Sequence, residues 1–222
     1  MVASPFLGAF VWRAVADALG SRGEQSVTLV PNVKIRGAAD DYEAIGQLAR
    51  EVRFERPVWV AHSGAGASLP SLLENAPPPG GVIFVDGLLP HPGRAWIDTA
   101  PPQLAAMIHA TARDGLAAPW PRWFGDHLTE FLPDPNDRAA LIADAPGIPL
   151  AFLRLCAPTV DLPDRTPCAF LRLSAAYDSE CSLVEARGWP AIRLEAHHLS
   201  IVTSPDRVVD HLVDLRRQMI SV

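Results

Sequence analysis

The chain is nearly free of lysine, has few cysteines and contains no long apolar run. Its 222 residues include three cysteines and 19 lysines or arginines, against 25 aspartates or glutamates, so the formal net charge is −6. Lys34 is the only lysine, which we interpret as genome composition without functional meaning. A net negative charge disfavours a general nucleic-acid-binding surface.

The cysteines also exclude two classes of site. Cys156, Cys168 and Cys181 lack the spacing of metal ligands, and their odd number argues against a disulfide framework. We therefore expect free thiols in a reducing compartment. The start of the chain, MVASPFLGAFVW, shows no signal peptide, and no apolar stretch is long enough to span a bilayer. The expectation is a cytoplasmic protein without nucleic-acid or membrane partners, and its oligomeric state is left open.

Short apolar runs alternate with segments of helical periodicity along most of the chain. We expect helices at Asp40–Phe54, after Ser63, and at Ser204–Met219, where Pro205 suits a first helical position. Strands are expected within Gln25–Val33, Pro57–Ser63, Val82–Val85, Pro167–Asp178 and Ala191–His198. Apolar strands alternating with helices indicate a mostly parallel sheet covered on both faces. With 49% hydrophobic residues, the chain is long enough for one domain with a substantial core.

One segment interrupts this alternation. Residues 90–163 are rich in proline, tryptophan and alanine, as in APWPRWFGDHL. We expect short helices joined by proline turns, inserted between two strands of the sheet as a small lid.

The stretch VWVAHSGAGASLP, residues 58–70, carries the main functional signal. Ser63 stands at the corner between an apolar strand and a helix, and ligands bind beyond the carboxyl ends of the strands in such sheets. Ala61 and Ala65 flank it at the two offsets where a sharp turn requires small residues, which is the pattern of a nucleophile elbow. The first N–H groups of the following helix, beginning with Gly64, can hold an oxyanion.

A serine nucleophile needs a base, and the base needs a carboxylate to orient it. His197 and His198 follow the last expected strand and lie at the same sheet edge as Ser63. Two acids compete for the remaining role. Asp178 follows the penultimate strand, and Asp86 follows the strand after the elbow.

These residues give the chain a resemblance to the α/β-hydrolase fold superfamily, as a small bacterial-type serine esterase or thioesterase-like member. VWVAHSGAG resembles the family's elbow, and GVIFVDGLLPHPG resembles the next strand, after which a lid is usually inserted. The resemblance implies a single domain over residues 1–222, with a minimal sheet of about six strands and the lid at about 90–163. The family's histidine commonly precedes, by seven residues, a proline that opens the last helix. Pro205 therefore favours His198 over His197, and the family's commonest acid position favours Asp178 over Asp86.

The N-terminal loop departs from the family pattern. The family's first strand usually ends in His-Gly, and the next residue donates an N–H to the oxyanion hole. Here the stretch is VASPFLG, and Pro5, near the donor position, has no N–H. The second donor must then come from Phe6 or Leu7, or be absent, and we take Gly64 as the first donor and Phe6 as the second.

The function predicted from these residues is cleavage of a small or medium apolar ester, thioester or related acyl compound. Ser63, His198 and Asp178 form the expected catalytic triad, and no metal or organic cofactor is needed. Two alternatives stay open. The first is a lyase that uses the same site without an acyl-enzyme, and the second is a non-catalytic binding protein with this fold. The residues expected to line the substrate pocket are His62, Trp96, Trp120 and Trp123.

Overall fold

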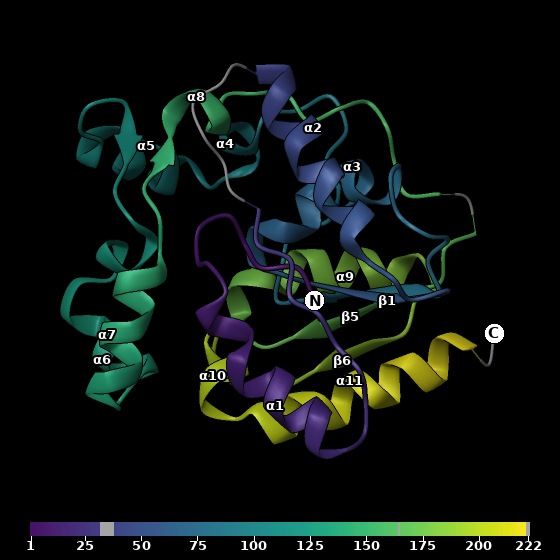
Figure 1. The fold of residues 1–222 in the computed structure, drawn as a ribbon. Coiled ribbons are helices and arrows are strands. Elements are labelled where there is room, and N and C mark those ends of the chain that lie inside the picture. Colours follow the sequence, from purple (N-terminus) through teal and green to yellow (C-terminus); the bar gives the residue numbers. More distant parts are fainter. Residues whose placement is uncertain (32–37, 164, 221–222) are drawn as a thin grey trace.

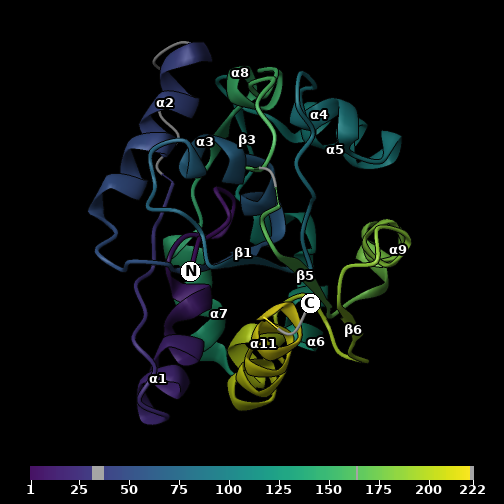
Figure 2. The ribbon, with the colours of Figure 1, turned by 90° about the vertical axis from the view of Figure 1, so that its right-hand side faces the viewer.

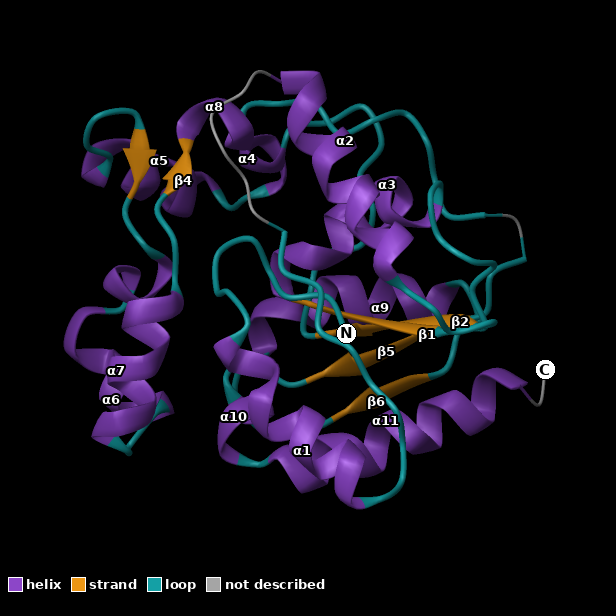
Figure 3. Ribbon diagram, viewed as in Figure 1, coloured by secondary structure: helices purple, strands orange, loops and turns teal. Residues whose placement is uncertain are grey.

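The computed structural model describes residues 1–31, 38–163 and 165–220, and its centre is a four-stranded parallel sheet (Figure 3). The strands follow the spatial order β1-β2-β5-β6. Every residue of β2 and β5 is buried, as expected for central strands that are covered on both faces. The bounds of the strands are Val58–His62 for β1, Gly81–Val85 for β2, Cys168–Arg172 for β5 and Ala191–Arg193 for β6.

Helices cover both faces of this sheet (Figure 1). One layer contains α1, α10 and α11, and Figure 2 shows α1 and α11 together below the sheet from a second direction. The other layer contains α2, α3 and α9. The bounds are Arg13–Ser21 for α1, Ala38–Leu48 for α2, Leu69–Leu73 for α3, Asp178–Ala186 for α9, Ser200–Thr203 for α10 and Pro205–Ile220 for α11. The predicted α/β architecture is therefore confirmed.

The N-terminal edge of the sheet is smaller than the sequence predicts. Val2 forms single bridges to Leu29 and Ala61, so two segments expected as strands contribute isolated bridges instead. In the register of the Val2–Leu29 bridge, the next donors along the ladder are Pro5 and Pro31, and proline has no N–H to donate. Within the described residues, the sheet therefore has four strands and two bridged segments instead of the expected six or so strands. The last part of the expected strand Gln25–Val33 lies outside the described residues.

The segment between β2 and β5 is mainly helical, as predicted, and lies beside the sheet (Figure 1). Proline opens α5 and α7, where its missing N–H costs nothing. A short antiparallel pair, β3 and β4, was not expected. Asp144, at the end of α7, accepts a 2.6 Å hydrogen bond from the N–H of Phe10 and so joins this segment to the N-terminal loop. The elements are α4 (Trp96–Thr99), α5 (Pro102–Thr111), β3 (Leu116–Ala117), η4 (Trp120–Trp123), η5 (Gly125–His127), α6 (Leu128–Phe131), α7 (Pro135–Asp144), β4 (Ile148–Pro149) and α8 (Leu150–Leu153).

The described residues also form the 3₁₀ helices η1 (Phe10–Trp12), η2 (Ala49–Glu51), η3 (Ser63–Ser68) and η6 (Ala175–Tyr177). The predicted helix Asp40–Phe54 is therefore divided, with α2 ending at Leu48 and η2 following it. Cys156, Cys168 and Cys181 are all free. Among the helices of the described ranges, none combines the length and the apolar character needed to cross a membrane. The cytoplasmic location stays a prediction.

Candidate active site

Ser63 occupies a strained turn at the end of β1, as the elbow pattern predicts. Its φ is 58°, in the left-handed region that residues other than glycine rarely adopt. Ala61 and Ala65 are completely buried on the two sides of the turn. After the serine, the chain continues as the 3₁₀ helix η3 (Ser63–Ser68) before α3, so the first helical turn is tighter than expected. The serine side chain is therefore presented at the carboxyl edge of the sheet.

A second strained turn packs directly against the first. Asp86 follows β2 with a φ of 40°, and the N–H of Leu88 donates to the carbonyl of Ser63 at 3.0 Å. Gly87 permits this approach, because a Cβ there would lie 2.6 Å from the carbonyl oxygen of Ser63 and 2.8 Å from its nitrogen. A Cβ on Gly66 would lie 1.9 Å from the carbonyl oxygen of Leu88. Two glycines thus allow the serine turn and the aspartate turn to touch.

The carboxylate of Asp86 is fully buried and binds the imidazole of His198. Nδ1 of His198 lies 2.7 Å from Oδ2 of Asp86. The same carboxylate accepts hydrogen bonds from the backbone N–H groups of Leu173 and Ser174 and from the Ser174 hydroxyl, at 2.7 to 2.8 Å. Burial alone would raise the pKa of Asp86, but the hydrogen bond and charge of His198 and the hydrogen bonds from Ser174 lower it overall. The group is therefore an ionised carboxylate at neutral pH.

Asp178, the preferred acid at the sequence level, is placed elsewhere. Its Oδ1 lies 2.7 Å from Nε of Arg172 and 3.2 Å from the guanidinium of Arg193, and these partners lower its pKa. The physical reason is local: Arg172 ends β5 beside Asp178 and pairs with it on the partly exposed side of α9. The structure thus brings Asp86, not Asp178, to the histidine.

Among the described residues, no hydrogen bond or ion pair joins a carboxylate to His197, the alternative base, or to His62, the expected pocket residue. His62 is completely buried, and its Nε2 lies 3.1 Å from the backbone oxygen of His198, a partner that only a protonated nitrogen can bind. Burial, followed by the neighbouring His198, lowers the pKa of His62 well below its ordinary value, so it stays neutral. His197 pairs through Nε2 with the Thr203 hydroxyl at 3.3 Å. The structure therefore separates His198 from its two neighbours by its acidic partner.

Tyr177 is the residue that approaches Ser63, and the sequence patterns did not indicate it. The side chain of Ser63 lowers the pKa of the Tyr177 phenol, against the larger effect of burial, which raises it. The ring of Tyr177 also stacks on the imidazole of His198, with centroids 5.5 Å apart and planes 14° apart. Among the described residues, no hydrogen bond joins the Ser63 hydroxyl to His198 in this structure, although both side chains line the same cavity. Catalytic hydrogen bonds are often long without substrate, so this arrangement is compatible with a nucleophile and its base.

The expected oxyanion donors lie together across the cavity. Gly64 is in the first turn of η3, where helix N–H groups lack intrahelical acceptors. A Cβ on Gly64 would lie 3.0 Å from the ring of Phe6 and 3.2 Å from Oγ of Ser4. The N–H of Phe6 donates to that Oγ at 3.3 Å, a long bond that an oxyanion could replace. Phe6 can therefore substitute for the donor that Pro5 lacks, and Ser4 is an additional polar group beside it.

Aromatic side chains surround the cavity above Ser63, which has a volume of about 640 Å³. Phe6 packs on Trp96 and Trp123 at 4.8 and 5.7 Å between ring centroids. Trp120 packs on Phe124 at 4.5 Å and on His198 at 5.5 Å. Trp96, Trp120 and Trp123 therefore line the cavity as predicted from the sequence, whereas the fully buried His62 does not.

Comparisons with known proteins were made by sequence and by structure. No protein-family model and no curated protein sequence matches the chain. Solved structures match along its whole length. An extracellular α/β-hydrolase from a Paenibacillus species, described as homologous to tobacco salicylic acid binding protein 2, is 15% identical, covers 96% of each chain and has a TM-score of 0.71. The chain has the α/β-hydrolase fold.

Other structures with the α/β-hydrolase fold that resemble this chain have different chemistries. Tomato methylketone synthase I, in complex with β-ketoheptanoate, is 12% identical over 99% of this chain and 97% of its own, with a TM-score of 0.70. A pyrethroid hydrolase from Sphingobium faniae is 16% identical over 97% and 95%, with a TM-score of 0.63. These identities establish the fold alone, so the activity has to be argued from the site.

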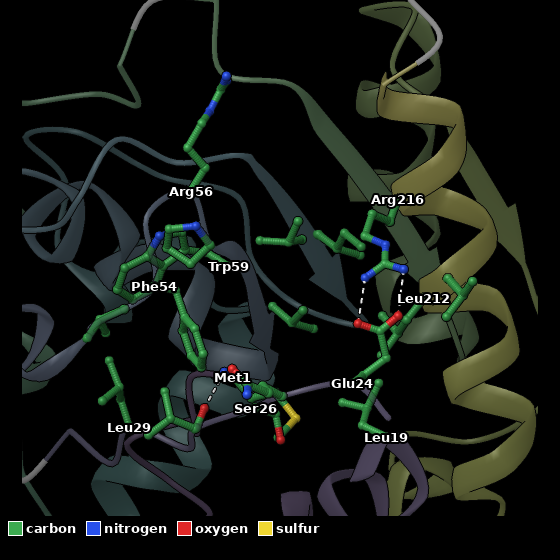
Figure 4. A pocket seen from close by; sticks show the side chains of 18 of the residues that line it. Met1, Leu19, Glu24, Ser26, Leu29, Phe54, Arg56, Trp59, Leu212 and Arg216 are labelled. Atoms are coloured by element: carbon green, nitrogen blue, oxygen red, sulfur yellow. Dashed lines mark hydrogen bonds and ion pairs between the residues drawn. The ribbon is translucent and has the colours of Figure 1, made fainter. Parts of the chain in front are cut away.

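A second cavity of this hydrolase-fold chain, of about 420 Å³, lies at the opposite end of β1 (Figure 4). Arg216 pairs with both carboxylate oxygens of Glu24 on one side of it, at 2.9 and 2.7 Å, and Trp59 and Phe54 lie on the other side. Among the described lining residues, Glu24 pairs with Arg216, whereas Nε1 of Trp59 is buried without a hydrogen-bond partner. Within the described part of the chain, no group of three or more histidine, cysteine, aspartate or glutamate side chains is placed to bind a metal.

Proposed function

We propose that this chain is a serine hydrolase with Ser63 as nucleophile, His198 as base and Asp86 as the carboxylate that orients the base. The observation that carries the proposal is the 2.7 Å contact between Asp86 and Nδ1 of His198 beside a serine with a φ of 58°. Since Nδ1 donates to Asp86, the free Nε2 is the atom that accepts a proton. Asp86 thereby replaces Asp178 in the triad that the sequence predicted.

The proposed reaction is acyl transfer to water in two steps. Nε2 of His198 takes the proton of Ser63 while Oγ bonds to the carbonyl carbon, and the carbonyl oxygen becomes an oxyanion between the N–H groups of Gly64 and Phe6. The imidazolium then returns its proton to the leaving alkoxide or thiolate, and the acyl-enzyme remains. Water gives a proton to the same nitrogen, attacks the acyl carbon and releases the acid and the free serine.

The aromatic lining of the cavity supports an apolar substrate. Tryptophan and phenylalanine side chains line it, and among the described lining residues Glu180 is the only acidic or permanently charged group, while His197 and His198 also line the cavity. A substrate carboxylate would lose its hydration without gaining an arginine or lysine partner, whereas a ring or alkyl chain would gain apolar contact. We therefore propose a neutral ester or thioester of small to medium size, consistent in kind with the pyrethroid hydrolase that shares the fold.

The test compares the wild type with Ser63→Ala. The wild type should hydrolyse short p-nitrophenyl esters and form a covalent fluorophosphonate adduct on Ser63, detected by mass spectrometry. Ser63→Ala should lose the adduct and at least a thousandfold of the turnover, the order expected for loss of a triad member. Ester turnover that survives Ser63→Ala contradicts the mechanism.

A lyase is the second candidate, and two observations favour keeping it. Among the described residues, no hydrogen bond joins Ser63 to His198, so Nε2 of the imidazole is free to take a proton from a substrate. One neighbour in the fold is also a methylketone synthase, crystallised with a β-keto acid. Turnover of a β-keto acid or another non-ester by the Ser63→Ala variant would support this chemistry. Absence of both activities and of the adduct would leave a binding protein.

A further inference from the structure

Tyr177 contacts two of the three residues assigned above, and neither contact is part of the triad. Its ring is stacked on His198 at 5.5 Å and 14°, and its phenol lies close enough to Ser63 for the serine side chain to lower its pKa. It also lines the cavity together with Ser63, Gly64 and His198. A phenol placed this way touches the oxygen at which the proposed reaction begins.

The protonation of the Tyr177 phenol determines whether it has a proton to donate. Burial raises the pKa of Tyr177 above its ordinary value, the side chain of Ser63 opposes this with a smaller effect, and the nearby negative charges of Asp86 and Glu180 raise the pKa further. The phenol therefore keeps its proton at neutral pH and can donate it. A serine hydroxyl that accepts from Tyr177 still has its own hydrogen available for Nε2 of His198.

We propose that Tyr177 is a catalytic residue whose hydroxyl donates a hydrogen bond to Oγ of Ser63 and stabilises the charge that develops there as His198 removes the proton. This inference rests on the proposed hydrolase function and adds a donor to it. During the step, the Ser63 proton moves to Nε2 of His198 and the electron pair of Oγ forms the bond to the carbonyl carbon. Tyr177 keeps its own proton throughout.

The remaining donors around the site explain why such a residue is useful. Pro5 has no N–H, and the N–H of Phe6 is already directed at Oγ of Ser4. The site therefore has fewer unengaged backbone donors than two strong oxyanion N–H groups would provide. A donor at Oγ would stabilise the same transition state at a different atom from the oxyanion donors. A single preorganised donor in a water-excluded site commonly increases the rate a hundredfold or more.

The test is Tyr177→Phe, which removes only the hydroxyl and keeps the ring that stacks on His198. Its matched control is Tyr42→Phe, because Tyr42 is the only other tyrosine and is buried against Phe152, with 5.7 Å between ring centroids. We expect Tyr177→Phe to slow both kcat for p-nitrophenyl esters and the fluorophosphonate labelling rate by about 10- to 100-fold, with KM within twofold. Tyr42→Phe should match the wild type in both.

Each other outcome has a defined meaning. Labelling and turnover of Tyr177→Phe at or above the wild-type rates, with Ser63→Ala inactive, overturns the role of Tyr177 and leaves the hydrolase intact. A wild type that neither labels nor turns over esters overturns both proposals.

A second measurement does not depend on the folding of a variant. Protein labelled with 3-fluorotyrosine should give one fluorine resonance for each of its two tyrosines. The fluorophosphonate adduct on Ser63 should shift the Tyr177 resonance and leave that of Tyr42 in place. Two unmoved resonances would overturn the contact.

Discussion

Nδ1 of His198 lies 2.7 Å from Oδ2 of Asp86, a carboxylate that ends β2 and is closed off from solvent. This pairing predicts that Asp86→Asn lowers kcat by about 10³- to 10⁴-fold, because an amide at this place favours the wrong imidazole tautomer. Asp178→Asn is the matched control and should keep activity close to that of the wild type. Ester hydrolysis by the two variants decides between the acids, and the opposite ranking would return the role to Asp178.

The contact between the serine turn and the aspartate turn predicts a severe effect of Gly87→Ala. The added Cβ would lie 2.6 Å from backbone oxygen of Ser63, so the elbow must move. We expect a loss of about 2 kcal/mol or more in the free energy of unfolding, together with loss of fluorophosphonate labelling. Urea denaturation measures the first and mass spectrometry the second.

Gly20→Ala is the control for that substitution. Gly20 lies in α1 with nothing within 4 Å of its added Cβ, so alanine should stabilise the protein by about 0.5–1 kcal/mol and leave labelling unchanged. Equal behaviour of the two alanine variants would contradict the tight packing of the turns.

Buried His62 predicts a loss of stability as the pH falls. Its folded-state pKa lies well below 6.5, so below about pH 6.5 the unfolded chain binds a proton that the folded chain does not, and unfolding is favoured. His62→Gln should reduce the dependence of the unfolding free energy on pH by up to about 1.4 kcal/mol per unit between pH 6.5 and pH 5. Chemical denaturation at both pH values measures it.

His127 supplies a control of opposite sign. Glu130 raises the pKa of this exposed histidine, so its protonation favours the folded state. His127→Gln should therefore increase the amount by which the free energy of unfolding falls as the pH is lowered. A His62→Gln protein with the wild-type pH dependence would show that His62 does not titrate between the two states.

Two tryptophans in different cavities test where the substrate binds. Trp96→Phe should raise KM for aromatic p-nitrophenyl esters by about 2- to 12-fold, because it weakens an aromatic contact worth about 0.5–1.5 kcal/mol. The acetate ester should be nearly unaffected. Trp59→Phe alters the far cavity of Figure 4 and should leave both KM values unchanged. Equal effects of the two substitutions would place the acyl group outside the aromatic cavity.

The sequence predicted the elbow well because local spacing determines it. Small residues at offsets of two from Ser63, an apolar strand before it and a helix after it are all local, and the structure reproduces each of them. The sheet edge was overestimated, because the apolar pattern of Gln25–Val33 does not reveal that two prolines occupy the next donor positions of the ladder.

The acid and Tyr177 could not be predicted, since both depend on which partner a side chain meets after folding. Asp178 and Asp86 each follow a strand at the correct edge of the sheet. They differ in their partners, because Asp178 pairs with Arg172, whereas Asp86 binds two backbone N–H groups and His198. Tyr177 stands next to Asp178 in the chain, and a single aromatic residue after a strand has no pattern that distinguishes it from a packing residue.

The hydrogen bond from Leu88 to Ser63 has a consequence for motion. Ser63 and Asp86 lie on two turns that are hydrogen-bonded to each other, so we expect thermal motion to displace the two residues together. Opening of the active site to a substrate then requires movement of the helices between β2 and β5 that carry Trp96 and Trp120, a segment that is joined to the N-terminal loop through Asp144. Changes in those helices, by evolution or by design, can therefore alter which substrates enter the cavity while the relative positions of Ser63 and Asp86 stay the same.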